Sequence, residues 1–295
     1  MQKKTVSLVL GSGGARGLAH IGIIECLIKN GYEIQSIAGS SMGALIGGIY
    51  AAGELDTYKH WVKALQQMDV LRLVDFSFRR SGLIKGERVM ETLKDLIGDR
   101  NIEDLPISFT AVATNIEDQK EVWLNHGSLF KAIRASIAIP TVFTPVQYRG
   151  KTLVDGCLVN PIPIAPTLRD KTDLTIAVNL SGKADSRQKK PVQQQRPPIN
   201  HSVDSYRQKI GLFIDGLQQK LGKEDDNEEL GVFEVVSNSI ETMQNLISRF
   251  QLAAYSPDMV IEIPFDSCAF YEFYRADEMI EIGRAQAQKV LEHYQ

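Results

Sequence analysis

The sequence contains few cysteines, and they show no pattern typical of a structural role. Its 295 residues include three, Cys26, Cys157 and Cys268, which are odd in number, far apart and without any C-x-x-C pair. Neither a disulfide framework nor a zinc knuckle is therefore predicted. Because such sparse cysteine use is typical of a reducing compartment, we expect a cytoplasmic protein.

Long hydrophobic runs are also missing. The longest apolar stretch, 42–53, is interrupted by Gly43, Gly47 and Gly48, and it falls well short of the roughly 18 residues that span a bilayer. Near the N-terminus, the apolar run Val6–Leu10 is too short for a signal peptide and leads directly into glycines. We expect neither export nor a transmembrane segment, and we keep peripheral membrane contact as a hypothesis.

The chain has no excess of basic charge. Lys and Arg number 33 against 36 Asp and Glu, for a formal net charge of −3, so no nucleic-acid partner is expected. Neither an H-E-x-x-H nor an EF-hand pattern occurs, so we expect metal-independent activity and no cofactor. The hydrophobic fraction of 43% and the charged fraction of 23% are those of a globular chain with a sizeable core, in one large or two small domains.

Strand-like and helix-like segments alternate along the chain. Thr5–Leu10 is β-rich, and a glycine cluster separates it from apolar residues at helical spacing that end before Gly31. A second strand at 34–38 and a helix of small residues at 44–52 predict a parallel βαβ opening. Further strands are predicted at 107–113, 121–124, 146–148, 152–154, 172–180 and 259–263, and further helices at 58–68, 86–97, 128–135, 232–252 and 276–294. This interleaving predicts an α/β protein.

One region departs from this pattern. Residues 182–230 hold a glutamine run, Pro197-Pro198 and an acidic cluster, with little strand propensity. We predict a core over 5–180, a polar and partly mobile insertion over 181–231, and C-terminal helices and a strand over 232–295 that complete the same domain. Within the insertion, Arg207–Lys223 has an apolar helical face and four basic residues against Asp215. It is either an interfacial lid or membrane contact, or a helix packed on its own core.

Gly39–Gly43 has the pattern G-x-S-x-G between a predicted strand and a predicted helix. The flanking glycines permit a tight strand-to-helix turn that holds the central Ser41 at a helix N-terminus. This position suits a nucleophile. The alternative is an ordinary β-to-α turn without chemistry, which the strand before the motif and the helix after it disfavour.

The glycine-rich segment Gly11–Gly17 is a second candidate, because its backbone N–H groups can converge on a negative oxygen. A P-loop needs G-K-[ST] where Arg16-Gly17-Leu18 stand, and a dinucleotide fingerprint needs glycine or alanine at position 16. An oxyanion hole needs only two convergent N–H groups near the nucleophile, and the first two strands of a parallel sheet end close together. Tight helix packing is the alternative without a catalytic role.

A serine nucleophile needs a base, and no histidine is well placed to be one. The histidines lie in the polar insertion, near the C-terminus, or before any suitable acid: His201, His293, His20, His60 and His126. Asp155, followed by Gly156, ends a predicted β-hairpin in a stretch with few other charges. An aspartate there either takes the serine proton directly or only forms an Asp-Gly turn.

Four motifs, Gly11–Gly17, Gly39–Gly43, Ala135-Ser136-x-x-x-Pro140 and Asp155-Gly156, together resemble those of the patatin-like phospholipases in content, order and spacing. The similarity is strongest over 6–180 and continues weakly through 253–283. It implies a three-layer α/β/α sandwich around a mainly parallel sheet, with Ser41 as nucleophile and Asp155 as its partner. It also implies an oxyanion hole formed by Gly11, Gly13, Gly14, Arg16 and Met42. Gly39, Gly43 and Gly156 are the glycines that support these motifs.

The activity that this resemblance implies is hydrolysis of a carboxylic ester in a lipid, by a phospholipase or lysophospholipase, through an acyl-enzyme. The expected partner is therefore a lipid or acyl-ester substrate. Three other hypotheses stay open: a transacylase that uses the same dyad, a regulatory binding module with little turnover, and a nucleotide-binding protein. The sequence determines neither the oligomeric state nor the preferred acyl chain and head group.

Two features lie outside the motifs. Cys157 stands where the family usually has glycine or alanine, so we expect its thiol to crowd the dyad or to make activity sensitive to oxidants. The basic residues Arg79, Arg80, Lys85 and Arg88 either receive a phosphate head group or form an ordinary solvated surface.

Overall fold

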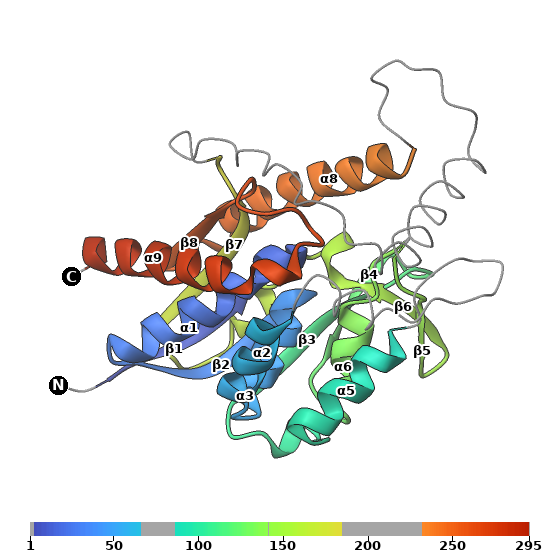
Figure 1. The fold of residues 1–295 in the computed structure, drawn as a ribbon, viewed down its shortest axis with the longest axis horizontal. Coiled ribbons are helices and arrows are strands. Elements are labelled where there is room, and N and C mark those ends of the chain that lie inside the picture. The colour runs from blue at the N-terminus through green and yellow to red at the C-terminus, as the bar shows by residue number, and fades with distance from the viewer. Residues whose placement is uncertain (1–2, 66–85, 141, 185–231, 295) are drawn as a thin grey trace, which may run out of the picture. The chain divides into compact units, whose positions relative to one another are not determined.

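A computed structural model describes residues 3–65, 86–140, 142–184 and 232–294 (Figure 1). The strands are β1 Lys4–Leu10, β2 Tyr32–Ser40, β3 Ser108–Asn115, β4 Lys120–Leu124, β5 Val146–Tyr148, β6 Lys151–Asp155, β7 Leu174–Gly182 and β8 Met259–Pro264. The helices are α1 Ala19–Lys29, α2 Met42–Ala51, α3 Leu55–Ala64, α5 Glu87–Ile97, α6 Leu129–Ser136, α8 Val232–Tyr255 and α9 Ala276–Tyr294. Short 3₁₀ helices lie at η1 Gly14–Leu18, η2 Ile102–Asp104, η3 Gly156–Leu158, η4 Ala165–Thr167 and η5 Phe273–Arg275.

The described strands form one mainly parallel sheet, which confirms the predicted fold class. Its order is β5-β6-β3-β2-β1-β7-β8, and β4 also pairs with β3. The pairings among β1, β2, β3, β7 and β8 are parallel, whereas β4, β5 and β6 join antiparallel. The strands β1 and β2 flank α1, as the predicted βαβ opening requires.

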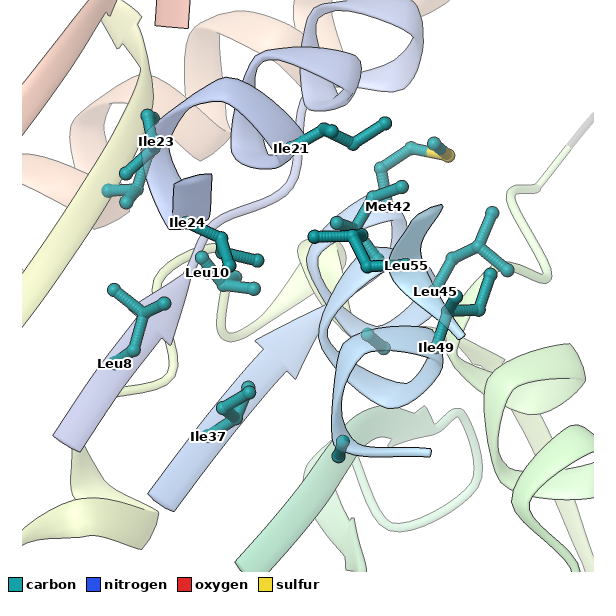
Figure 2. Close-up of a cluster of buried hydrophobic side chains, with 14 of the residues drawn as sticks. Leu8, Leu10, Ile21, Ile23, Ile24, Ile37, Met42, Leu45, Ile49 and Leu55 are labelled. Carbon is teal, nitrogen blue, oxygen red and sulfur yellow. The ribbon is translucent and has the colours of Figure 1, made fainter. Parts of the chain in front are cut away.

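Helices cover both faces of the sheet, in three layers. Because side chains alternate along a strand, Leu8 and Leu10 of β1 join the large buried cluster with α1 and α2, whereas Val9 packs with Ala177 of β7 and Leu252 of α8. Figure 2 shows Leu8, Leu10 and Ile37 on the side of the strands where α1 and α2 lie. The sheet core is therefore closed on both faces by apolar packing.

Two helices of the first layer, α1 and α9, pack backbone against backbone. A Cβ atom added to Gly22 of α1 would lie 1.9 Å from the carbonyl oxygen of Ile280, and one added to Gly283 of α9 would lie 2.1 Å from the carbonyl oxygen of Ala19. Each glycine thus makes room for the backbone of the other helix. This close contact fixes the position of α9 against α1.

The predicted helix 58–68 differs from the structure at both ends. Helix α3 begins earlier, at Leu55, because Leu55 is buried and forms one apolar stripe with Tyr58 and Val62. It ends at Ala64, where Leu65 adopts an extended conformation.

The chain divides into two compact units, residues 1–184 with 244–295, and residues 185–243. Nearly all of the predicted insertion, including Arg207–Lys223, lies outside the described residues, and its first two residues belong to the end of β7. Among the helices that the structure describes, none combines the length and apolarity needed to cross a bilayer.

Candidate active site

Ser41 lies in a sharp turn between β2 and α2. Its backbone has φ 55° and ψ −121°, an unusual conformation for a residue with a side chain. The flanking glycines allow this turn: a Cβ on Gly39 would lie 2.4 Å from the carbonyl group of Gly43, and a Cβ on Gly43 would lie 2.0 Å from the carbonyl oxygen of Leu10. The G-x-S-x-G pattern is therefore required by close backbone contact.

Ser136, the last residue of α6, holds the turn in place. The Ser41 amide donates to the Ser136 hydroxyl at 3.0 Å, and that hydroxyl donates to the carbonyl oxygen of Val112 on β3 at 2.6 Å. Ser136 is fully buried. Ser136 belongs to the motif Ala135-Ser136-x-x-x-Pro140, but no local pattern indicates a contact across 95 residues, so this role could not be predicted from the sequence.

Strand register brings Asp155 to Ser41. Ser40 pairs with Val112, and the next residue of β3, Ala113, pairs with Asp155 at the end of β6. The Ser41 hydroxyl donates to Oδ2 of Asp155 at 2.6 Å. Gly156 permits this approach, since a Cβ there would lie 2.2 Å from the carbonyl oxygen of Val112.

The Asp155 carboxylate is fully enclosed by protein. Its side chain has no exposed surface, and Oδ1 accepts a hydrogen bond from the Cys157 amide at 2.8 Å. Burial raises the pKa of Asp155 to about 6, although the hydrogen bonds from Ser41 and Cys157 act in the opposite direction. The group is thus ionised at neutral pH yet close to its protonation range, which suits a base that later donates the proton.

The glycine-rich segment follows β1, whose last residue pairs with Gly39 of β2. The amides of Gly11, Ser12 and Ala15 donate to the carbonyl oxygens of Val178, Pro161 and Phe270, at 3.1, 2.9 and 2.9 Å. By contrast, the amides of Gly13 and Gly14 make no hydrogen bond to any other residue that the structure describes. These two N–H groups, and the Met42 amide in the first turn of α2, are available to a ligand.

Arg16 and His20 hold this segment from two sides. The buried Arg16 guanidinium donates to the carbonyl oxygen of Phe265, in the loop after β8. The His20 ring is fully buried and its Nε2 hydrogen-bonds the carbonyl oxygen of Gly11 at 2.9 Å. Burial lowers the pKa of His20 to about 4, so the ring is neutral at pH 7 and must carry its proton on Nε2 to donate.

The model of the patatin-like phospholipase family matches residues 8–168. The chain belongs to this family. A Mycobacterium tuberculosis protein named an uncharacterized NTE family protein is 38% identical over 98% of this chain and 92% of its own length. A protein named lysophospholipase NTE1 from Debaryomyces hansenii is 24% identical over all of this chain, which spans 18% of its length.

Among solved structures, VipD from Legionella pneumophila aligns with a TM-score of 0.49 and 14% identity, over 99% of this chain and 67% of VipD. Membership of the patatin-like phospholipases supports a lipid hydrolase with a lipid substrate.

No described histidine of this patatin-like protein hydrogen-bonds to Ser41 or Asp155. His20 contacts Gly11, and the other three described histidines bond to groups on the surface: His60 to Asp56, His126 to Asn125 and His293 to Lys289. His201 lies outside the described residues. Within the described chain, the Ser41 contact is therefore a two-residue arrangement.

The surroundings of Cys157 disfavour the oxidant sensitivity expected there, which stays a prediction. Its thiol is buried and accepts a hydrogen bond from Nε2 of Gln244 on α8 at 3.0 Å. Burial and the charge of Asp155 raise the pKa of Cys157 well above its usual value, so the thiol stays protonated and poorly reactive. The thiol therefore lies between Gln244 of α8 and the Asp155 carboxylate, which it also contacts.

The predicted head-group site is only partly described. Arg88 is exposed on α5, whereas Arg79, Arg80 and Lys85 lie outside the described residues. A surface pocket lined by Tyr32, Glu33 and Ile107 lies where β2 and β3 begin. Since Ser41 follows the other end of β2, this pocket belongs to the opposite edge of the sheet.

Proposed function

We propose that this protein is a serine acyl hydrolase that cleaves carboxylic esters of glycerolipids or lysophospholipids through Ser41 and Asp155. The observation that carries the proposal is the 2.6 Å hydrogen bond from the Ser41 hydroxyl to the buried Asp155 carboxylate. A buried carboxylate with a pKa of about 6 is a stronger base than an ordinary aspartate. It therefore makes the serine oxygen more nucleophilic without a histidine.

In the first half-reaction, the Ser41 oxygen attacks the acyl carbonyl carbon while its proton moves to Asp155. The carbonyl oxygen becomes an oxyanion, which the free amides of Gly13 and Gly14, with Met42, stabilise by hydrogen bonds. The protonated Asp155 then gives its proton to the leaving alcohol oxygen as the ester bond breaks. The products of this step are an acyl-serine ester and a free alcohol.

In the second half-reaction, water takes the place of the serine as nucleophile. The water oxygen attacks the acyl-serine carbonyl carbon while Asp155 accepts a proton from the water. The same amides stabilise the new oxyanion. Return of the proton to Ser41 releases a fatty acid and restores the free enzyme. After the cycle, Ser41 and Asp155 are in the same protonation states as at the start.

The relatives suggest the first substrates to test. The fungal protein from Debaryomyces hansenii is named a lysophospholipase, and a lysophospholipid has one acyl ester next to an exposed hydroxyl. Lysophosphatidylcholine and phosphatidylcholine should therefore be compared with a short-chain ester, which reports the chemistry without a lipid surface.

The test is labelling with a fluorophosphonate probe together with hydrolysis of the short-chain ester. We expect Ser41→Ala to lose labelling and Asp155→Asn to lose turnover by about a thousand-fold or more. Ser7→Ala is the matched control, because Ser7 is also a buried serine but belongs to none of the four motifs, and its hydroxyl bonds to Asp170. A folded wild type that neither labels nor hydrolyses esters would contradict the proposal and favour a regulatory binding module.

Analysis of the products separates hydrolysis from acyl transfer. With water as acceptor, free fatty acid should appear in proportion to alcohol. Acyl product that forms only when an acceptor alcohol is added would instead identify a transacylase that uses the same dyad.

A further inference from the structure

The loop between β8 and α9 exposes an unusual number of aromatic rings. Phe265, Phe270, Tyr271 and Tyr274 are 46%, 39%, 71% and 38% exposed, within ten residues. We call residues 265–274 the aromatic loop. Aromatic side chains are costly to leave in water and are enriched where a protein meets a lipid interface. This loop is therefore a candidate binding surface.

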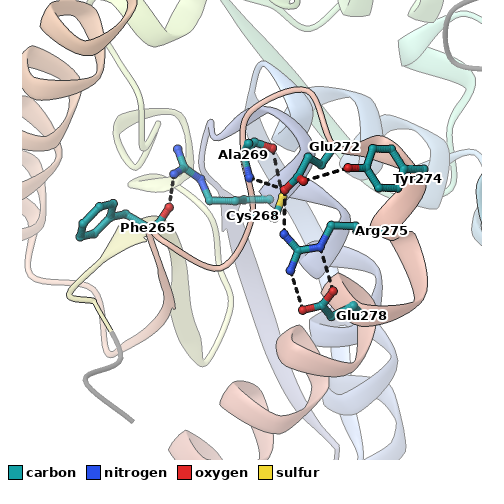
Figure 3. A network of polar contacts seen from close by, with 8 residues as sticks. Phe265, Cys268, Ala269, Glu272, Tyr274, Arg275 and Glu278 are labelled. Atoms are coloured by element: carbon teal, nitrogen blue, oxygen red, sulfur yellow. Dashed lines mark hydrogen bonds and ion pairs between the residues drawn. The ribbon is translucent and has the colours of Figure 1, made fainter. Parts of the chain in front are cut away.

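The aromatic loop is held in one conformation by ion pairs and hydrogen bonds (Figure 3). Arg275 contacts Glu272 at 2.7 Å and both carboxylate oxygens of Glu278 at 2.6 and 2.8 Å. Glu272 in turn accepts from the Ala269 amide at 2.8 Å and from the Tyr274 hydroxyl at 2.9 Å. A surface fixed in this way loses little conformational entropy when it binds.

The same loop lies directly against the glycine-rich segment of the active site. The Phe270 carbonyl accepts from the Ala15 amide, and the Phe265 carbonyl accepts from Arg16. The Phe270 ring covers Gly14 so closely that a Cβ on Gly14 would lie 2.2 Å from it. One ring of the aromatic loop therefore borders the amide that we place in the oxyanion hole.

We propose that the aromatic loop is the surface with which this protein docks on an uncharged or zwitterionic lipid surface, so that an acyl chain can leave the lipid beside Gly14. This inference rests on the proposed lipid hydrolysis. Since Ser41 is only 3% exposed, a lipid ester must leave the lipid surface to reach it. The charges of the loop select the lipid class. Asp266, Glu272 and Arg275 are the charged residues of 265–275, and no lysine is present to attract an anionic surface.

The experiment is vesicle flotation of the full chain carrying Ser41→Ala, which leaves the vesicle lipids intact. Two vesicle compositions are compared, phosphatidylcholine alone and equal parts of phosphatidylcholine and phosphatidylglycerol. Tyr271→Ser and Phe270→Ser are each added to this parent. Tyr294→Ser is the matched control, because Tyr294 is also exposed but contacts Asp258 before β8, at the opposite edge of the sheet.

We expect the partition coefficient on phosphatidylcholine to fall about five-fold with Tyr271→Ser or Phe270→Ser, which corresponds to roughly 1 kcal/mol of interfacial burial. Tyr294→Ser should bind like the parent, and phosphatidylglycerol should add little. Thermal unfolding checks that each variant is folded, and Tyr271 is so exposed that its loss should not affect the core.

Several results would overturn the proposal. These are a parent that does not float with phosphatidylcholine, equal flotation of all variants, or a changed oligomeric state with unchanged flotation. Binding that needs phosphatidylglycerol and disappears in high salt would assign the contact to the basic stretch Arg207–Lys223 instead. Because flotation needs no turnover, failure of fluorophosphonate labelling in the wild type would remove the proposed hydrolysis without affecting this result.

Discussion

Asp155 combines a functional advantage with a cost in stability. Burial raises its pKa from 3.8 to about 6, so the folded chain binds this proton more tightly than the unfolded chain does. Below pH 3.8 Asp155 is protonated in both states, and its tighter proton binding in the folded state makes its full favourable contribution to the free energy of unfolding. As the pH rises from there to about 6, the contribution is lost, and above it the folded protein holds a buried charge.

This titration predicts the pH dependence of activity. For a soluble short-chain ester, kcat/KM should fall about ten-fold per pH unit below the pKa of about 6 and level off above it, because only ionised Asp155 accepts the Ser41 proton. The measurement is kcat/KM from about pH 5 to about pH 8. A profile that is flat through pH 6 would contradict the role of Asp155 as the base.

The same burial predicts that Asp155→Asn stabilises the inactive protein. The amide oxygen can accept from the Cys157 amide, and the NH₂ group can donate to the Ser41 oxygen, which reverses the direction of that hydrogen bond, so both pairs stay hydrogen-bonded without the charge. We expect a gain on the order of 1–3 kcal/mol in the free energy of unfolding at neutral pH, which shrinks as the pH falls toward 4.

Denaturant unfolding at two pH values measures this gain. Asp173→Asn is the control with the opposite sign, because hydrogen bonds from Thr5 lower the pKa of that exposed carboxylate. Lower stability of Asp155→Asn at neutral pH would show that the buried charge contributes favourably to the fold.

Ser136 is predicted to matter for both stability and rate. Ser136→Ala leaves the Ser41 amide and the Val112 carbonyl without their partner, at a cost of about 1–3 kcal/mol. Since the first of these groups belongs to the nucleophile, kcat should fall while KM changes little. Ser128→Ala, at the N-cap of the same helix, should lower stability without lowering kcat, and an equal effect of the two variants on kcat would refute a positioning role for Ser136.

At the scale of elements, local sequence patterns predicted most of the strands and helices. Runs of β-branched residues and the glycine boundaries place β1, α1, β2 and α2, because these patterns act within a few residues. The contacts that complete the candidate site do not arise locally. Gln244 of α8 reaches Cys157, and Ser136 reaches Ser41; neither contact has a sequence spacing that a periodicity could reveal.

The crossing of α1 and α9 provides a prediction at this scale. Replacing glycine by alanine inside a helix normally stabilises it by up to about 1 kcal/mol, but Gly283→Ala would put a Cβ 2.1 Å from the Ala19 carbonyl oxygen. We therefore expect a loss of roughly 1–3 kcal/mol or more. Helix α9 also begins beside Arg275, so its displacement should reach the aromatic loop and reduce fluorophosphonate labelling.

Denaturant unfolding and labelling rates measure both effects of Gly283→Ala. Gly53→Ala serves as the comparison, because Gly53 has φ +79° but no atom within contact distance of an added Cβ. Its cost should be only the backbone strain, about 1 kcal/mol. A Gly283→Ala protein as stable as the wild type would show that α9 can move away from α1 without loss.

At the scale of the whole molecule, topology explains why motifs far apart in sequence share one edge. The strands β1, β2 and β3 are neighbours and parallel, so the segments after β1 and β2 emerge together, and β6 delivers Asp155 to the same place by pairing antiparallel with β3. Ligands commonly bind at the carboxyl ends of strands in open α/β sheets. The loop after β8 joins this edge because β8 is also parallel to its neighbour, which no motif in that loop indicated.

The division of the chain into units provides the last prediction. Residues 1–184 and 244–295 form one compact unit that contains all the described strands, both members of the Ser41–Asp155 contact and the Gln244 and Gln251 contacts of α8. Replacement of 185–231 by a Gly-Ser linker should therefore leave cooperative unfolding and fluorophosphonate labelling of Ser41 in place. Loss of labelling in a cooperatively folded variant would show that the replaced residues supply part of the site, whereas loss of the fold itself would show that they belong to the core and are not an insertion into it.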